Sequence, residues 1–222
     1  MDNPWKEHII QTYRKRAANY DITANLYYLF GYREWTYRKM AVKALKLRQG
    51  DTVLELACGT GINFPLYQKH IGSQGIIIGV DITDAMLEQA QKRVTNQGWK
   101  NVVLFRHDAA IYRPPLPVNA VISTFAISLF PDLDQVLKNI SDSLLPKGHL
   151  SLLELQIPSF WPAWLANTAV ALMKPFAVTD EWVNKRPWEI IQRTMRKSFN
   201  DVKINERYFG LTYIISGEKP IS

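Results

Sequence analysis

The sequence has 222 residues, of which 47% are hydrophobic and 21% charged, a composition typical of a folded globular domain rather than a disordered chain. The formal net charge of +7 favours anionic partners, but no run of five like charges is present, so nucleic acid is not an expected partner. Cys58 is the single cysteine, which excludes a disulfide within the chain, and the first ten residues lack the apolar run of a secretory signal, so we expect a cytoplasmic protein.

The pattern of polar and apolar residues changes near residue 50. Residues 1–50 are rich in tyrosine, arginine and lysine, and their pattern predicts two or three helices with a break near Gly31. Beyond them, strands are predicted at 52–57, 75–80, 101–105, 118–124 and 149–155, and helices at 62–71, 84–96 and 133–145. This alternation indicates right-handed crossovers and a parallel sheet covered by helices on both faces.

The last third of the chain has a different pattern. Residues 157–197 contain several tryptophans and prolines, which predicts one or two helices plus loops. Residues 201–208 and 211–217 are β-rich and too close together for a crossover, so they must pair as antiparallel neighbours. The predicted fold is α/β, with a Rossmann-like, seven-stranded, mostly parallel sheet that ends in an antiparallel hairpin. Within this single domain we expect an N-terminal helical lid (1–50), a ligand-binding core (51–156), a helical substrate cap (157–200) and the hairpin (201–222).

A glycine-containing turn between the first predicted strand and helix is the central feature of the sequence. Residues 55–61 read ELACGTG, and Gly59 and Gly61 permit a tight turn and close approach of a ligand to the backbone. Ligands of open α/β sheets bind at this edge, outside the carboxyl ends of the strands. A dinucleotide fingerprint is not satisfied because Phe64 stands where its third glycine would be, and no P-loop is present.

Three acidic residues lie at the ends of successive predicted strands. Glu55 would repel a pyrophosphate but attract a ligand that carries an ammonium and a sulfonium, as S-adenosylmethionine (SAM) does. Asp81 follows the second strand, where a carboxylate can accept both ribose hydroxyls. Asp108 follows the third strand and could accept the adenine amino group, with the backbone of Ala109 beside the ring. Two apolar side chains could flank the adenine: Ile82 and Met86.

These residues resemble the class I SAM-dependent methyltransferases. The run 55–61 resembles their first motif, E/D-x-G-x-G-x-G, with Ala57 in place of the first glycine. The resemblance covers about residues 12–217 and implies SAM as methyl donor and S-adenosylhomocysteine (SAH) as product. Residues 13–21, YRKRAANYD, resemble the Y-x-x-x-A-x-x-Y-D start of ubiquinone/menaquinone C-methyltransferases and phospholipid N-methyltransferases. That start implies a lid helix with Tyr13 and Tyr20 near the methionine end of the cofactor. The family also implies that three residues after the fourth strand lie near the methyl group: Ser123, Thr124 and Phe125.

Methyl transfer from a sulfonium is an in-line displacement, in which the protein supplies position and electrostatics. No metal-ligand constellation is present, so no metal is expected, and the candidate bases are His107, Tyr20 and Tyr28. The aromatic segment 157–183, with Tyr27, Tyr28 and Phe30, is expected to form the acceptor pocket, with plain core packing as the alternative. Residues 157–176 could also rest on a membrane surface, where basic side chains would meet anionic lipid: Lys174, Lys185 and Arg186.

The expected function is methyl transfer to nitrogen or oxygen, and less readily to carbon, of a small or lipid-like acceptor. A SAM-binding module without catalysis and a phospholipid or quinone methyltransferase at a membrane surface are the alternatives. The acceptor motif N/D-P-P-Y is replaced after the fourth strand by STFA, which speaks against an enzyme acting on base amino groups or amides. Phe64 likewise disfavours an NAD-dependent oxidoreductase. The sequence does not specify an oligomeric state.

Overall fold

The computed structural model describes residues 4–17, 31–174 and 178–221. The helices are α1 (Pro4–Arg16), α3 (Glu34–Ala44), α4 (Phe64–Ile71), α5 (Asp84–Gln97), α6 (Leu133–Ser143), α7 (Ala163–Met173), α8 (Asp180–Lys185) and α9 (Pro187–Ser198), with a 3-10 turn, η3 (Ile127–Leu129). The strands are β1 (Thr52–Leu56), β2 (Ile76–Asp81), β3 (Val102–Arg106), β4 (Val118–Thr124), β5 (Leu144–Leu155), β6 (Asn200–Arg207) and β7 (Thr212–Glu218).

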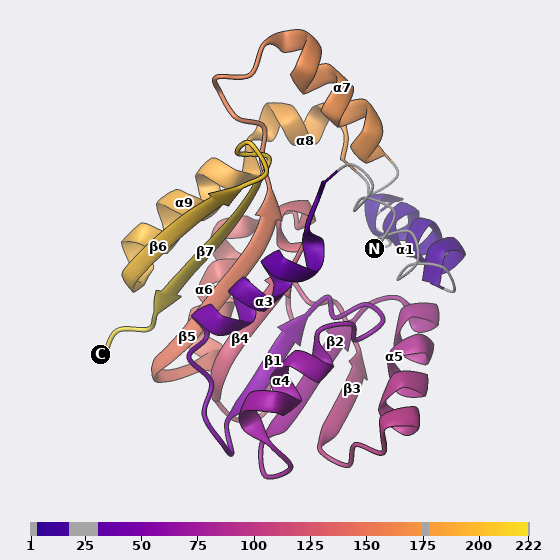
Figure 1. Cartoon of the computed structure of the whole chain (residues 1–222), viewed down its shortest axis with the longest axis vertical. Helices are drawn as coiled ribbons and strands as arrows, with labels where there is room; N and C mark the ends of the chain where they lie inside the picture. The colour runs from indigo at the N-terminus through magenta and orange to yellow at the C-terminus, as the bar shows by residue number, and fades with distance from the viewer. Residues whose placement is uncertain (1–3, 18–30, 175–177, 222) are drawn as a thin grey trace.

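The strands form a seven-stranded sheet in the order β3-β2-β1-β4-β5-β7-β6. Strands β1 to β5 pair in parallel, whereas β7 pairs antiparallel with both β5 and β6. The predicted fold class is therefore confirmed, including the terminal hairpin. The hairpin inserts β7 between β5 and β6, so the second of its strands, not the first, joins the parallel part of the sheet (Figure 1).

Two hydrophobic cores fill the space between the sheet and its helices. On one face, Ala41 and Val42 of α3, Phe64 and Tyr67 of α4, and Ala90 of α5 pack against the strands. The second core contains buried side chains from α6, α7, α8 and α9. Each central strand thus contributes to both cores, which explains why runs such as 53–56 are apolar without strict alternation.

Several predicted boundaries need correction. Helix α4 begins at Phe64 rather than at residue 62, with Pro65 in its first turn as expected. Strand β5 begins at Leu144, so residues 144–148 extend the strand where the sequence predicted the end of a helix and a break. Helix α5 begins at Asp84, as predicted, but ends at Gln97, one residue later than expected. The described part of residues 157–197 includes three helices, α7, α8 and most of α9, where one or two were predicted.

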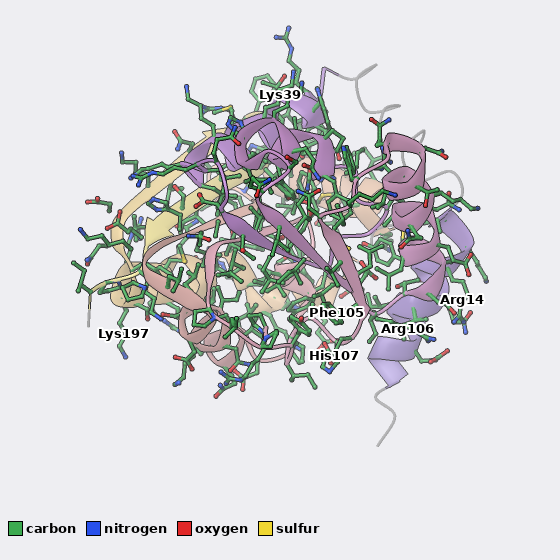
Figure 2. All side chains as sticks on the ribbon, turned by 90° about the horizontal axis from the view of Figure 1, so that it is seen from below. Arg14, Lys39, Phe105, Arg106, His107 and Lys197 are labelled. Carbon is green, nitrogen blue, oxygen red and sulfur yellow. The ribbon has the colours of Figure 1, made fainter. Side chains whose placement is uncertain are left out.

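Helices α7 and α8 lie together beyond the carboxyl end of β5, near the turn of the β6–β7 hairpin, and α1 lies on the opposite side of the same end beside α5 (Figure 1). None of the helices in the described ranges combines the length and apolar character that crossing a bilayer requires. Basic side chains are spread around the molecule: Arg14, Lys39 and Lys197 project on separate sides (Figure 2).

Candidate active site

A first cavity of about 100 Å³ opens at the carboxyl ends of β1, β2 and β3. Its walls include most of the residues that the sequence assigned to the cofactor: Tyr13, Ala57, Gly59, Asp81, Ile82, Met86, Asp108, Ala109, Thr124 and Phe125. They come from six segments of the chain, which the parallel topology brings to one edge of the sheet. Ligand binding at this edge is thus consistent with the strand order.

Asp81, the last residue of β2, has both carboxylate oxygens engaged by the backbone. Its Oδ2 accepts the N–H of Gly59 at 2.8 Å, and its Oδ1 accepts the N–H of Thr83 at 2.8 Å. Burial raises the pKa of Asp81, and these donors partly oppose the rise. Asp81 also lines the cavity, so a hydroxyl group bound there would meet a charged acceptor.

The opposite wall of the cavity is polar at one point and apolar elsewhere. The Oδ1 of Asp108 accepts the backbone N–H of Ala110 at 3.0 Å, which fixes the carboxyl at the end of β3. Met86 is buried and Ile82 half-buried beside it. A flat heteroaromatic group with an exocyclic amine would find apolar faces and an acceptor in this arrangement.

The turn after β1 is strained at one residue. Ala57 has φ +55°, in the left-handed region that favours glycine, and its methyl group belongs to the cavity wall. Gly61 has φ +68°, and a Cβ there would meet the Phe64 ring at 2.5 Å, so only glycine fits. Gly61 does not line the cavity and acts through this turn. The loop is therefore shaped by Gly61 and lined by Ala57 and Gly59.

Helix α1 closes the cavity from outside. Its residues Ile9 and Tyr13 belong to the cavity wall. Arg14 binds the Asp84 carboxylate at the start of α5 through two hydrogen bonds of 3.0 and 2.8 Å. Arg14 is the main cause that lowers the pKa of Asp84 to about 2, and Arg106 of β3 contributes. Figure 2 labels both arginines on this side of the molecule, close to α1. An ion pair thus anchors the covering helix beside the cavity.

Glu55 lies beneath the cavity and not in its wall. It is only 1% exposed, and its Oε1 accepts the side-chain N–H of Asn63 at 2.6 Å. Burial raises the pKa of Glu55 to about 7, and Asn63 and the charge of Arg38 oppose the rise. The sequence assigned Glu55 to a cationic ligand, but the structure directs it into a buried polar network.

This network reaches the cavity through Thr124. The Thr124 hydroxyl accepts a hydrogen bond from Arg38 at 2.8 Å and one from Asn63 at 3.2 Å. The Arg38 guanidinium is 3% exposed, pairs with Glu34 at 2.7 Å, and lies 5.3 Å from the centroid of the Phe125 ring. A charged group buried this deeply needs such partners. Arg38 therefore fixes two cavity residues, and no sequence motif pointed to it.

A second, larger cavity of about 360 Å³ adjoins the first. Its walls are mainly apolar and come from α7, α8 and the turn of the hairpin, including Trp161, Leu165, Met173, Trp182 and Leu211. Three residues line both cavities: Tyr13, Phe125 and Leu129. A molecule bound in one cavity is therefore separated from a molecule in the other only by this shared wall.

The sequence matches the model of a known protein family. Residues 3–171 match the ubiE/COQ5 methyltransferase family. The chain belongs to this family. Demethylmenaquinone methyltransferase of Lactobacillus johnsonii is 34% identical over 145 residues, which is 64% of this chain and 59% of that protein. Ubiquinone/menaquinone biosynthesis C-methyltransferase UbiE of Francisella tularensis subsp. holarctica is 30% identical over 162 residues, 70% of this chain and 63% of that protein.

The fold of this ubiE/COQ5 family member has solved counterparts. The DhpI–SAH complex aligns over 99% of this chain and 100% of the other, with a TM-score of 0.69 and 17% identity. The predicted resemblance to class I SAM-dependent methyltransferases is thus confirmed at the level of family and fold. The matches to the curated relatives span about three fifths of their length, 59% and 63% in these two cases.

Several predicted site residues of this protein do not line the first cavity or fall outside the described residues. His107 is exposed at the end of β3, lines neither cavity, and has its ring 5.5 Å from that of Tyr112, so the structure does not support it as a base (Figure 2). Ser123 is fully buried and does not line the first cavity. Tyr20, Tyr27, Tyr28 and Phe30 fall outside the described residues.

Glu154 was not predicted, although it lines the second cavity. A signal was present in the sequence, because residues 152–155 (LLEL) repeat the pattern of residues 53–56 (VLEL), an acid near the end of an apolar strand. In β1 this acid points into the buried network. In β5 it lies in the cavity wall, and the difference comes from which face of the sheet each side chain takes.

Proposed function

We propose that this protein transfers the methyl group of SAM to a ring carbon of a quinol-type, lipid-tailed acceptor. The adjacency of the two cavities carries the proposal, because a cleft with two carboxyl groups at the strand ends, Asp81 and Asp108, meets a large apolar cavity across one shared wall. Nitrogen and oxygen remain chemically accessible acceptors, but the relatives named above act on quinones, and the UbiE relative is a C-methyltransferase.

The first cavity suits SAM residue by residue. Asp81 would accept the ribose hydroxyls, and Asp108 with the Ala109 backbone would receive the adenine between Ile82 and Met86. The methionine end would then lie toward Thr124 and Phe125, next to the second cavity. SAM supplies an electrophilic methyl group on a sulfonium when bound. The residues of this chain hold it in line with the acceptor and exclude water.

The second cavity suits a fused aromatic ring with an apolar tail. Aliphatic and aromatic side chains form most of its walls, with two carboxyl groups and several hydroxyl groups among them. Burial of apolar surface would supply the affinity, while the polar groups would orient the ring. Tyr32 contributes an aromatic ring to the wall, and its hydroxyl is hydrogen-bonded to that of Thr212 at 2.8 Å. The sequence assigned this kind of contact to Tyr27, Tyr28 and Phe30.

The test is turnover of a defined acceptor. Purified protein is incubated with methyl-labelled SAM and a short-chain demethylmenaquinone reduced to its quinol, and the product is identified by mass spectrometry. The expected product carries one additional carbon-bound methyl group. SAM binding without label transfer to quinol, phenol or amine acceptors would overturn the proposal and leave the non-catalytic SAM-binding module.

We further propose that the protein meets a membrane surface with an apolar rim formed by Phe160, Trp164, Leu172 and Phe209, all of them at least 66% exposed. Leu172 also lines the second cavity, and the Trp161 indole N–H bonds the Phe209 carbonyl at 3.1 Å, which joins the two parts of the rim. A lipid-tailed acceptor could pass from a bilayer into the cavity along this rim.

We expect charge to contribute less to this contact than the sequence suggested, because two of the three basic residues named for it are ion-paired and Lys174 alone is in none of the ion pairs among the described residues. Lys185 pairs with Glu181 at 2.7 Å and Arg186 with Glu189 at 2.8 Å, so neither offers an uncompensated charge to anionic lipid. We therefore expect the protein to sediment with phosphatidylcholine vesicles, and adding phosphatidylglycerol to have a small effect. The double variant Trp164→Ala/Leu172→Ala should lose sedimentation. Leu116→Ala, at a site 74% exposed elsewhere, is the matched control, and equal sedimentation of both variants would refute the contact.

A further inference from the structure

Glu154 is a buried carboxyl group near the end of β5, and it is only 1% exposed. Its neighbour across the β5–β7 pairing is Tyr213, which is also buried. None of the ion pairs among the described residues includes Glu154. A carboxylate buried without a cation is costly, so its persistence here calls for a specific function.

Three neutral donors hold the Glu154 carboxyl in place. Its Oε1 accepts the backbone N–H groups of Ala126 at 3.0 Å and Ile127 at 2.8 Å, and its Oε2 accepts the Ser128 hydroxyl at 2.7 Å. These residues form the start of η3, directly after Phe125 of the shared wall. The carboxyl is therefore fixed relative to the wall across which the methyl group must pass.

Glu154 also differs from the other carboxyl group of the second cavity. Glu34 lines the same cavity, but it is paired with the Arg38 guanidinium at 2.7 Å. The remaining polar side chains in the wall carry either a hydroxyl or an indole group. The hydroxyl groups belong to Tyr13, Tyr32, Ser128, Thr168 and Tyr208, and the indoles to Trp161 and Trp182. Of the two carboxyl groups in this cavity wall, Glu34 is therefore ion-paired, whereas Glu154 has no cationic partner among the described residues.

We propose that Glu154 is a catalytic residue that accepts the hydroxyl proton of the acceptor ring. The inference rests on the proposed function, since it needs a hydroxylated aromatic acceptor in the second cavity. A group placed on the wall between the cavities can contact the ring oxygen while the ring carbon beside it faces the methyl group.

The step balances in atoms and charge. The hydroxyl proton moves to a Glu154 oxygen, and the electron pair released on the ring raises the nucleophilicity of the adjacent carbon. That carbon forms a bond to the methyl group as the sulfur–methyl bond breaks and its electron pair stays on sulfur. The ring carbon then loses its hydrogen as a proton to solvent, and the ring oxygen recovers a proton from Glu154.

The raised pKa of the Glu154 carboxyl group agrees with this role. Burial raises the pKa of Glu154 to about 7, and the Ser128, Ala126 and Ile127 donors oppose a larger rise. A base with a pKa near the working pH combines sufficient carboxylate with sufficient basicity. The titratable groups that face it are the Tyr213 phenol, whose pKa burial holds well above its ordinary value, and the cavity groups Glu34, Tyr32 and Tyr208.

The decisive variant is Glu154→Gln, because it keeps an acceptor oxygen for the η3 backbone and a group that can bond Ser128. We expect kcat with demethylmenaquinol to fall by about 100-fold or more, the range for loss of a general base, and the acidic limb of the kcat–pH profile to disappear. SAM affinity should stay within about twofold of wild type, since Glu154 is outside the first cavity. A fall in thermal stability with the acidic limb retained would identify a structural role only and overturn the inference.

Ser128→Ala serves as a second test, because it removes one donor that favours the carboxylate. The acidic limb should move to higher pH, whereas a residue that only supports the wall would leave it in place. If Glu154→Gln does not fold, Glu154→Asp retains a carboxyl and should keep the acidic limb at reduced kcat. Loss of that limb in Glu154→Asp, or an unmoved limb in Ser128→Ala, contradicts the proposal.

Infrared spectra of the protein without acceptor separate this inference from the proposed function. Between about pH 8 and pH 6 a protonated-carboxyl band should appear, and Glu154→Gln should remove part of it, while Glu55→Gln removes a different part. Wild-type protein that fails to methylate the quinol refutes the proposed function. A band unchanged in Glu154→Gln refutes the titration of Glu154, whether or not the quinol is turned over.

Discussion

Removing the Asp81 carboxylate is the most direct test of the cofactor site. The N–H groups of Gly59 and Thr83 hold its two oxygens, both at 2.8 Å, at the wall of the first cavity, where ribose hydroxyls would donate to them. A hydrogen bond to a charged group contributes about 1.5–3 kcal/mol. At the lower end of this range, loss of one bond to a ribose hydroxyl corresponds to about a tenfold weaker affinity, and loss of two to about a hundredfold.

We therefore expect Asp81→Asn and Asp81→Ala to weaken SAM and SAH binding in titration calorimetry by about 10- to 100-fold, the alanine variant more strongly. The alanine variant also leaves the Gly59 and Thr83 N–H groups without their acceptor, which should loosen the turn after β1. Asp142→Ala, on the distant helix α6, is the control and should bind like wild type. Wild-type affinity in a correctly folded Asp81→Ala protein would refute the assignment of this cavity to the cofactor.

Three further predictions concern the lid, the turn and the buried network. Arg14→Ala removes both bonds to Asp84 and should speed amide exchange in residues 4–17 and release of SAH, while the neighbouring Lys15→Ala should not. Ala57→Gly relieves a left-handed φ of +55° and should stabilise the protein in thermal unfolding by about 1 kcal/mol; a destabilised variant would mean that the methyl packing outweighs the strain. Burial raises the pKa of Glu55 from 4.5 to about 7, so the folded state holds a proton that the unfolded state has released. Stability should therefore fall as pH rises from 4.5 to about 7, by about 3 kcal/mol from this group. Urea unfolding at both pH values should give a smaller fall in Glu55→Gln, and an equal fall would contradict the shift.

Local patterns in the sequence were sufficient for the architecture. Apolar runs at residues 53–56, 76–80 and 118–124 predicted strands buried on both faces, and the short spacing of the last two β segments required an antiparallel pair. Strand ends also predicted where Asp81 and Asp108 would meet, because parallel strands bring their carboxyl ends to one edge.

The direction in which a buried polar side chain points was harder to predict. The sequence places Glu55 beside the glycine turn but does not reveal that Asn63 and Arg38 draw it beneath the cavity, since those contacts join residues from separate elements. Arg38 lies in an ordinary amphipathic helix, and Glu154 lies in an apolar strand. Arg38 follows no motif, and the repeated pattern at residues 152–155 does not tell which face of the sheet Glu154 takes, so only the packing of α3 and η3 against the sheet gives them their positions.

Tyr13 belongs to the walls of both cavities, and this has a kinetic consequence. Because helix α1 carries it, we expect displacement of α1 to uncover both cavities in a single motion. Under the proposed function, release of SAH and entry of the next acceptor would then be one event. We expect the frequency of this event, set in part by the Arg14–Asp84 pair, to limit turnover even where methyl transfer itself is fast.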